Sequence, residues 1–533
     1  MTTAPASAAA SRPWLAILAV LCGAFISTLN GRLSSFGLAD IRGAVHAGFD
    51  EGAWIVTAQT AGQMLITPLA IWAAGPYGQR RVLMWGVALF GVVELLLPFS
   101  QTLGQVLACQ FLSGVGSGTF IPLTLPVVLR STPPRLWAWG IAVYALNLEL
   151  SLNISASLEQ WYIDHGGWQM IFWQNVPLAL AMGLCLKWGL PHQPWPERRK
   201  LPGLFGAVSM SIGLTMIYAA LDQGNRLNWL GSGVVVGLLL GGAVLIATSL
   251  LHLRLLPSDW FHLRLGLEWP LPLLLVLVSV LRLTILSTSY LIPQYLILVR
   301  GYRTFEVGQA LVWIAIPQVI TAPLAALFLR RTDSRLVAGI GLTAVALACF
   351  TVAGTMTAQW GPQQFLATQL LQAFGQSMAL SGIVFTSVLH MRPEIQLTFG
   401  GLIQTARLMG GEVGLAITTT LLRVNEQSAS NLIGQHVVAG GYDTAVRLNA
   451  YAGAVGAATP AGETAARATA LLAAAVRQAA NMQSFITCFT GIAVASCVAL
   501  VVVVIVGQAP QGPARHRPLA LPWRRAPVSP RQE

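Results

Sequence analysis

Apolar stretches alternate with short polar connections along nearly the whole chain, from Pro13 to Gly507. A helix needs about 20 mainly apolar residues to cross a bilayer, and each stretch approaches or exceeds that length. Hydrocarbon offers no hydrogen-bonding partners, so a spanning segment must pair its backbone groups within a helix. The pattern predicts fourteen transmembrane helices, over residues 14–39, 52–74, 82–100, 104–130, 137–158, 169–190, 203–222, 229–252, 269–298, 307–329, 335–358, 362–390, 398–423 and 484–507.

Three segments depart from this pattern. Residues 191–202 (PHQPWPERRKLP) read as a short basic linker. Residues 424–483 are rich in Ala and Gly and are predicted to form one long external loop, of which the part from Glu463 to Asn481 can be a helix. Residues 508–533 are rich in Pro and Arg, so we expect a disordered tail whose positive charge suits anionic lipid.

Composition and charge indicate a polytopic membrane protein and predict its orientation. Hydrophobic residues make up 55% of the chain and charged residues 9%. With the N-terminus in the cytoplasm, twenty of the 31 Lys and Arg residues fall on the inner side, eight on the outer side and three within spans. This bias predicts that both termini are cytoplasmic. The first span, preceded only by Arg12, is interpreted as a retained helix rather than a signal peptide.

Several classes of function are not expected from this sequence. The net charge of +12 is explained by topology, and no soluble domain offers a face for nucleic acid. The six cysteines fall within predicted spans, and His390 and His436 lack metal-ligand spacing. No Gly-x-x-x-x-Gly-Lys loop is present to bind a nucleotide. We therefore predict neither an enzyme nor a bound metal or cofactor.

Four segments carry a family resemblance: EGAWIVTAQTAGQMLITPLAIW (51–72), GWQMIFWQNVP (167–177), SYLIPQYLILVRGYRTFEVGQ (289–309) and QTARLMGGEVGLAI (404–417). With them the chain resembles the fourteen-span drug:proton antiporter branch of the major facilitator superfamily, which includes EmrB- and QacA-like multidrug exporters. The resemblance implies an all-α fold of two six-helix bundles plus two extra helices. Its predicted parts are an N-terminal bundle (1–190), a linker with the extra helices (191–268), a C-terminal bundle (269–507, with the loop 424–483) and a basic cytoplasmic tail (508–533).

The chain departs from the family at positions linked to proton coupling. The loop motif Gly-x-Leu-Ala-Asp-Arg-x-Gly-Arg-Arg keeps Gly78, Arg80 and Arg81, but its acidic residue is Gly75 here. The helix 5 motif Gly-Pro-x-x-Gly-Gly is absent.

Two further departures affect helices that line the family's cavity. The usual acid of helix 1 is Asn30, and the usual arginine of helix 4 is Gln110. Both polar residues are candidates for substrate binding. Nearby, Gly114, Gly116 and Gly118 are interpreted as sites of close helix packing.

Six ionisable residues are predicted in mid-span, where a charge costs roughly 2.5–3.5 kcal/mol: Arg32, Glu94, Glu149, Arg282, Arg407 and Glu412. One interpretation is mutual pairing, because three are basic and three acidic. By resemblance, helices 1 and 9 face the central cavity, so Arg32 and Arg282 are candidates for binding a carboxylate. Arg407 matches a family position and is expected to be structural.

A desolvated carboxyl can bind and release a proton, which makes the three acids coupling candidates. Glu149 comes first because it lies near the middle of helix 5, and Glu412 second. Glu94 ranks last because its helix is expected at the periphery. On helix 12, Gln369, Gln372 and Gln376 form one stripe that suits either substrate or interhelical hydrogen bonds.

These observations predict a secondary exporter of small amphipathic compounds, carboxylates included, in a bacterial inner membrane. Proton coupling is expected, as is assembly with a periplasmic membrane-fusion adaptor and an outer-membrane channel. A facilitator or importer without antiport is the first alternative, because the coupling motifs are replaced. A non-transporting sensor or lipid-handling protein is the second.

Overall fold

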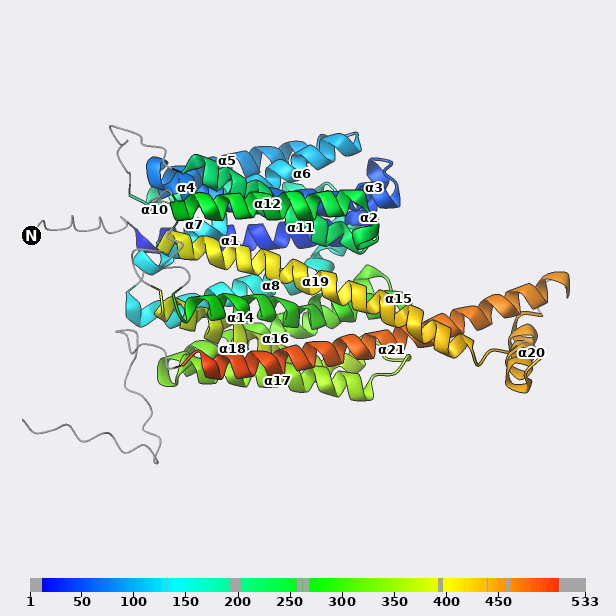
Figure 1. Ribbon diagram of the computed structural model, residues 1–533. Coiled ribbons are helices and arrows are strands. Elements are labelled where there is room, and N and C mark those ends of the chain that lie inside the picture. The colour runs from blue at the N-terminus through cyan, green and yellow to red at the C-terminus, as the bar shows by residue number, and fades with distance from the viewer. Residues whose placement is uncertain are drawn as a thin grey trace, which may run out of the picture.

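The computed structural model describes residues 12–131, 133–191, 203–255, 261, 268–391, 396–438, 440–456 and 461–507. Within these ranges the secondary structure is entirely helical (Figure 1). The basic tail 508–533 and most of the linker 191–202 lie outside the described residues.

The helices fall into three groups along the chain. The first group is α1 (Pro13–Phe36), α2 (Leu38–Ala44), α3 (Phe49–Gly52), α4 (Trp54–Tyr77), α5 (Gln79–Leu96), α6 (Leu103–Ser117), α7 (Phe120–Ser131), α8 (Trp137–Gly166), α9 (Met170–Trp173) and α10 (Asn175–Gly189). The second is α11 (Leu204–Gly224) and α12 (Gly233–Leu255). The third is α14 (Leu271–Leu286), the π-helical segment η4 (Ser287–Leu291), α15 (Ile292–Leu298), α16 (Thr304–Arg331), α17 (Ser334–Thr355), α18 (Leu366–Leu389), α19 (Gln396–Gly434), α20 (Tyr442–Gly456) and α21 (Ala461–Ile505).

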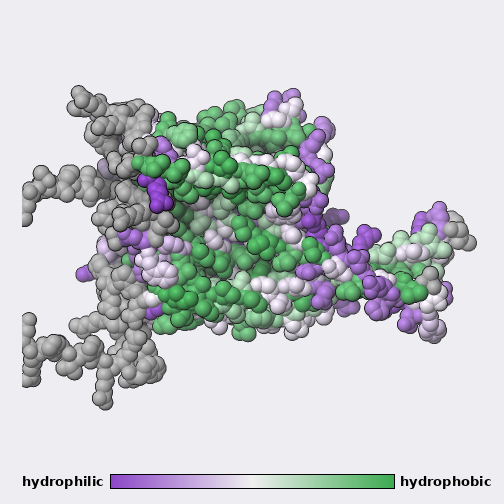
Figure 2. Space-filling view, in the orientation of Figure 1, coloured by the Kyte–Doolittle hydropathy of each residue, from purple (hydrophilic) through white to green (hydrophobic). Residues whose placement is uncertain are grey.

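The surface of the bundle is that of a membrane protein. Eleven helical segments of the described chain are long and apolar enough to cross a bilayer. Large apolar side chains such as Leu180, Ile320 and Val504 are exposed, and apolar residues cover most of the face of the bundle seen in Figure 2. Such a surface is stable in lipid, where apolar exposure carries no hydration penalty.

The other three predicted spans, 52–74, 362–390 and 398–423, correspond to α4, α18 and α19. These helices carry buried polar residues, among them Gln63, Gln372 and Gln404, which lower their mean hydropathy. Their polar faces are turned into the protein, where other helices satisfy them. The total of fourteen spans stays a prediction.

Two halves pack against each other along α8 and α19. Helix α8 of the first group packs on α16 and α18, while α4, α7 and α11 pack on α19. Ile141 and Leu152 of α8 belong to the same buried apolar cluster as Leu281 and Ile383 of the third group. The extra helices α11 and α12 pack on each other, and α11 lies along α4.

The predicted external loop 424–483 is largely helical. Helix α19 continues to Gly434, α20 spans Tyr442–Gly456, and α21 begins at Ala461. The reason is its composition, since this stretch is rich in the strong helix former Ala and has a single proline, Pro460. These helices extend beyond the bundle, as Figure 1 shows on the right. We call that end, with α3 and α20, the distal end; at the proximal end α1 begins and α21 ends.

Candidate functional site

Three arginines from both halves, of which Arg407 is buried and the other two are half-buried, form a cluster between the bundles. Arg32 comes from α1, Arg282 from α14 and Arg407 from α19. Arg282 lies within electrostatic range of both other guanidinium groups and of Tyr144 on α8. Tyr144 also interacts with Arg407. Four helices thus bring three like charges and one phenol together.

The polar contacts of the arginines leave positive charge uncompensated. The Nη2 atom of Arg32 donates to the Ser289 carbonyl at 2.7 Å, and its guanidinium lies 5.0 Å from the Phe36 ring centre. The Nε atoms of Arg32 and Arg282 are buried without a hydrogen-bond partner.

Arg407 is better satisfied by its neighbours. Its Nε atom donates to Gln404 Oε1 at 3.0 Å, and its Nη1 atom donates to Thr28 Oγ1 at 3.4 Å. Among the described residues, none of the three arginines forms an ion pair with a carboxylate. The predicted mutual pairing of the mid-span charges is therefore not what the structure contains.

Glu94 lies elsewhere, inside the first half. Its Oε1 atom accepts hydrogen bonds from Asn30 at 2.7 Å and Ser113 at 2.5 Å, and its Oε2 atom accepts one from Asn175 at 3.0 Å. The side chain is fully buried among α1, α5, α6 and α10. Glu94 thus contacts Asn30, the residue at the helix 1 position where the family has an acid. From the sequence the helix of Glu94 is expected at the periphery, yet the Glu94 side chain is buried.

Glu149 lies at the contact between the two halves. Its Oε2 atom accepts a hydrogen bond from Ser377 on α18 at 2.8 Å, and its Oε1 atom is buried without a partner. One turn further along α8, Asn153 donates to Gln318 on α16 at 3.0 Å. The polar face of α8 therefore joins the halves.

The three glutamines in the stripe on α18 form hydrogen bonds with other residues of the second half. Gln369 donates to the Ala310 carbonyl at 3.2 Å, Gln372 to Ser287 at 3.1 Å and Gln376 to Thr288 at 3.0 Å. These bonds favour the interhelical interpretation over the substrate interpretation. Gln110 of α6 similarly donates to Ser34 of α1 at 3.3 Å, while its Oε1 atom is buried without a partner.

The retained loop-motif residues Gly78, Arg80 and Arg81 lie at the proximal ends of α4 and α5. Gly78 has φ 83°, a conformation that favours glycine, and it ends α4. Arg80 donates to the Lys187 carbonyl at 2.8 Å, which ties α5 to α10, and Arg81 donates to the Tyr77 carbonyl at 3.2 Å.

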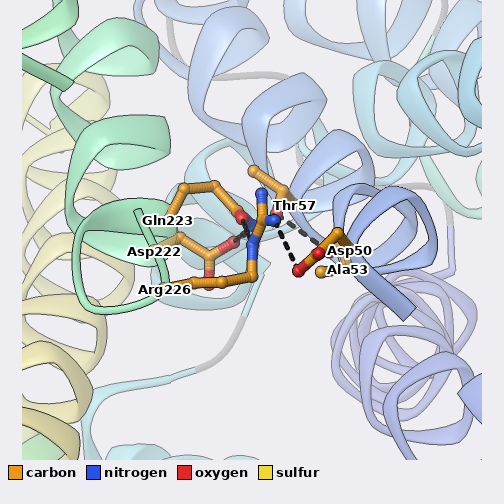
Figure 3. A network of polar contacts seen from close by, with 6 residues as sticks. All are labelled: Asp50, Ala53, Thr57, Asp222, Gln223 and Arg226. Atoms are coloured by element: carbon orange, nitrogen blue, oxygen red, sulfur yellow. Dashed lines mark hydrogen bonds and ion pairs between the residues drawn. The ribbon is translucent and has the colours of Figure 1, made fainter. Parts of the chain in front are cut away.

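Sequence reasoning missed a second polar group at the distal end, shown in Figure 3. Asp222, near the end of α11, accepts hydrogen bonds from Thr57 of α4 and from Gln223, the latter at 2.9 Å. Glu412 of α19 lies within electrostatic range of Asp222. The signal was weak because Asp222 is the last residue of its predicted span, where an acid is ordinary. Tyr144 was likewise missed, because a single tyrosine does not stand out on a helix that carries several polar residues.

The fold and the buried polar groups at its centre define a polytopic helical protein of two facing bundles. The chain matches the family model described as Major Facilitator Superfamily over residues 20–415. It belongs to the Major Facilitator Superfamily, and this confirms the fold predicted from the motifs.

Its relatives and structural neighbours agree with this assignment. The chain is 22% identical to the multidrug export protein EmrB of Escherichia coli (strain K12) over 405 residues, covering 76% of this chain and 79% of EmrB. It is 22% identical to the fatty acid resistance protein FarB of Neisseria gonorrhoeae, covering 78% and 81%. The fold matches the crystal structure of the human organic anion transporter MFSD10 with a TM-score of 0.55 at 14% identity, covering 92% of this chain and 98% of that one. The predicted resemblance to the EmrB-like branch is confirmed.

Proposed function

We propose that this chain is a secondary exporter of small amphipathic organic anions, carboxylates included, and that the arginine cluster binds the anionic group. One observation carries the proposal: between the halves, Arg282 lies within electrostatic range of both Arg32 and Arg407, and none of the three has a carboxylate partner among the described residues. A buried cation without a counter-ion is costly, and an anion would relieve that cost through charge-assisted hydrogen bonds. A fatty acid, the class in FarB's name, has this chemistry.

The position of the cluster suits alternating access. Arg32 belongs to the first half, and Arg282 and Arg407 to the second. Without an anion the three charges repel one another across the contact between halves. An anion held by both sides would offset that repulsion and change the relative stability of the open and closed arrangements.

Export is coupled to protons in this proposal, with Glu149 as the coupling acid and Glu412 and Glu94 as the other candidates. Glu149 contacts the opposite half through Ser377 and has one unpartnered carboxyl oxygen, so a change in its protonation would be felt at that contact. Asn30 and Gly75 replace the acids usually linked to coupling, which keeps a facilitator without antiport as the alternative.

In the cell, the proposed location is a bacterial inner membrane with fourteen spans, and the proximal end faces the cytoplasm. The basic residues near that end support this orientation. The helices of residues 424–483 then project outward, where they are suited to contact a periplasmic adaptor of a tripartite pump with an outer-membrane channel.

The test is transport of a labelled medium-chain fatty acid, with its neutral amide as comparison, by purified protein in liposomes under an imposed pH gradient. We expect the wild type to move the acid, and the Arg32→Gln, Arg282→Gln double variant to move it at least about tenfold more slowly. Arg467→Gln is the matched control, because Arg467 is exposed and pairs with Glu463 four residues away on the same helix. Full transport of the acid by a well-folded double variant would contradict the site; wild-type transport that ignores the gradient would favour the facilitator.

A further inference from the structure

Helix α11 lies along the contact between α4 of the first half and α19 of the second, and it packs on both. At the proximal end α4 and α19 meet directly, because a Cβ atom on Gly401 would lie 1.8 Å from the Cδ1 atom of Ile71. At the distal end, the residues that follow α11 take part in the contact between the halves. The two ends of this contact are therefore built differently.

Side-chain hydrogen bonds fix the distal end of α11 to the first half. The Thr57 hydroxyl of α4 donates to Asp222 of α11, and Gln223 donates to the same carboxylate oxygen at 2.9 Å (Figure 3). Just beyond α11, Arg226 donates to Gln223 at 2.7 Å and pairs with Asp50 of α3 at 3.1 Å. Because these contacts lie within the first group of helices and α11, they need not change when the halves move apart.

The residues beyond α11 also contact α19 of the second half. Trp229 donates its indole N–H to the Thr420 hydroxyl at 3.2 Å. The same hydroxyl donates to Asn225 Oδ1 at 3.5 Å, and Arg423 donates to the Asn225 carbonyl at 3.1 Å. Moving α19 away from α11 breaks these three hydrogen bonds and leaves those with α3 and α4 in place.

The backbone at Trp229 has an uncommon conformation that presents the indole to α19. Its φ is 46°, and that of the preceding Asn228 is 64°, which are left-handed values that bulky residues rarely adopt. The ring packs on Gly224, where an added Cβ atom would lie 2.6 Å from it. A strained backbone persists where surrounding contacts determine it. Trp229 is thus held by Gly224 on one side and by Thr420 on the other.

We infer that residues 225–229 form a latch, which α11 carries on the first half and which closes the distal end of the contact between α4 and α19 by binding Thr420 and Arg423. Each hydrogen bond contributes modestly to net stability, since the released groups can bind water at that end, so the latch is reversible. It uses none of the three clustered arginines and depends neither on the compound carried nor on proton coupling. It therefore goes beyond the proposed function.

The latch can be tested by pulsed electron spin resonance, which measures distances between two spin labels. The labels are attached at Glu51→Cys of α3 and Gln427→Cys of α19, both exposed, in the full-length protein with its six native cysteines replaced, in lipid nanodiscs without substrate. Thr420→Val removes the hydroxyl, and Trp229→Phe removes the indole N–H. We expect each change to raise the ratio of long to short distances about fivefold.

Two further variants separate loss of the latch from general loosening. Thr419→Val is the matched control, because the Thr419 hydroxyl donates to carbonyl groups of its own helix, and its distances should equal those of the wild type. Thr420→Ser keeps the hydroxyl and should also behave as the wild type. A matching rise in Thr419→Val, or no rise in both Thr420→Val and Trp229→Phe, would overturn the latch.

A third label position shows which half carries the latch. Leu230 is 76% exposed and directly follows Trp229. A label at Leu230→Cys should keep its distance to Glu51→Cys in Thr420→Val and should move away from Gln427→Cys. The reverse result would contradict the attachment to the first half. Neither measurement needs a substrate, so failure of fatty-acid export with an intact distance response would refute the exporter and leave the latch.

Discussion

At the scale of single residues, the ionisable side chains inside the bundle differ in whether all their polar atoms have hydrogen-bond partners. Glu94 accepts three hydrogen bonds and has no unpartnered oxygen, so its environment stabilises it as it stands. Arg32, Arg282 and Glu149 each retain a buried polar atom without a partner. Such an atom costs roughly 1–3 kcal/mol or more when charged. A ligand or a proton can remove a cost of this kind, which ranks Arg32, Arg282 and Glu149 ahead of Glu94 as functional candidates.

Glu149→Gln should abolish proton-driven transport while leaving substrate binding measurable. The amide cannot take up or lose a proton at physiological pH, yet it has nearly the shape of the acid and can accept the Ser377 hydrogen bond. The measurement is substrate uptake by inverted vesicles under an imposed pH gradient, paired with equilibrium binding to the purified variant.

The control for that variant is Asp164→Asn on the same helix. Asp164 is exposed at the distal end of α8, and its carboxylate accepts a hydrogen bond from Gln160. Its transport should equal that of the wild type. Unchanged proton-coupled uptake by the Glu149→Gln protein would remove Glu149 from the coupling role and bring Glu412 and Glu94 forward.

At the scale of elements, the packing of α4 against α6 depends on glycine. A Cβ atom placed on Gly114 would lie 1.9 Å from the Gln59 carbonyl oxygen of α4, and one on Gly62 would lie 2.2 Å from the Phe111 carbonyl of α6. The two backbones therefore touch, as the interpretation of the glycine run as a packing site predicts.

Gly114→Ala should destabilise the protein by about 3 kcal/mol or more, because backbone rather than a flexible side chain blocks the added methyl group. Gly104→Ala on the same helix should cost nothing, since a Cβ atom there has open space. The fraction of protein that survives heating, measured by size-exclusion chromatography in detergent, compares the two. Equal survival would show that α4 and α6 can move apart without loss.

The positions of most helices along the chain could be predicted from the sequence, but which helices pack against each other could be predicted less well. Apolar length alone located α1, α12 and α17, because a spanning helix must be continuous whatever it touches. It failed for residues 424–483, where helix continues outside the long apolar stretches because Ala favours it. The arginine cluster was predicted in part: Arg32 and Arg282 were paired from family layout, while Arg407 and Tyr144 joined them through tertiary packing that no local pattern encodes.

At the scale of the whole molecule, the extra helix α11 connects the two halves. Helix α11 packs on α4 of the first half and on α19 of the second. The residues that make the distal contacts with α19, such as Trp229 with Thr420, are far apart in sequence. Their juxtaposition could not be read from the sequence, because the order of helices in space follows from packing of the complete bundle.

The orientation of the molecule in the membrane is the last expectation open to a direct test. Helices α1 and α21 begin and end at the proximal end, opposite α20 (Figure 1). The excess of basic residues at the inner loops predicts that the proximal end is cytoplasmic. A cysteine at Ala454, which is exposed on α20, should then react with a membrane-impermeant maleimide in intact cells with a permeabilised outer membrane. A cysteine at Ser529 should react only after the inner membrane is disrupted.

The unmodified protein is the control for its six native cysteines. Labelling of Ser529→Cys from the periplasm would reverse the orientation and, with it, the direction of transport.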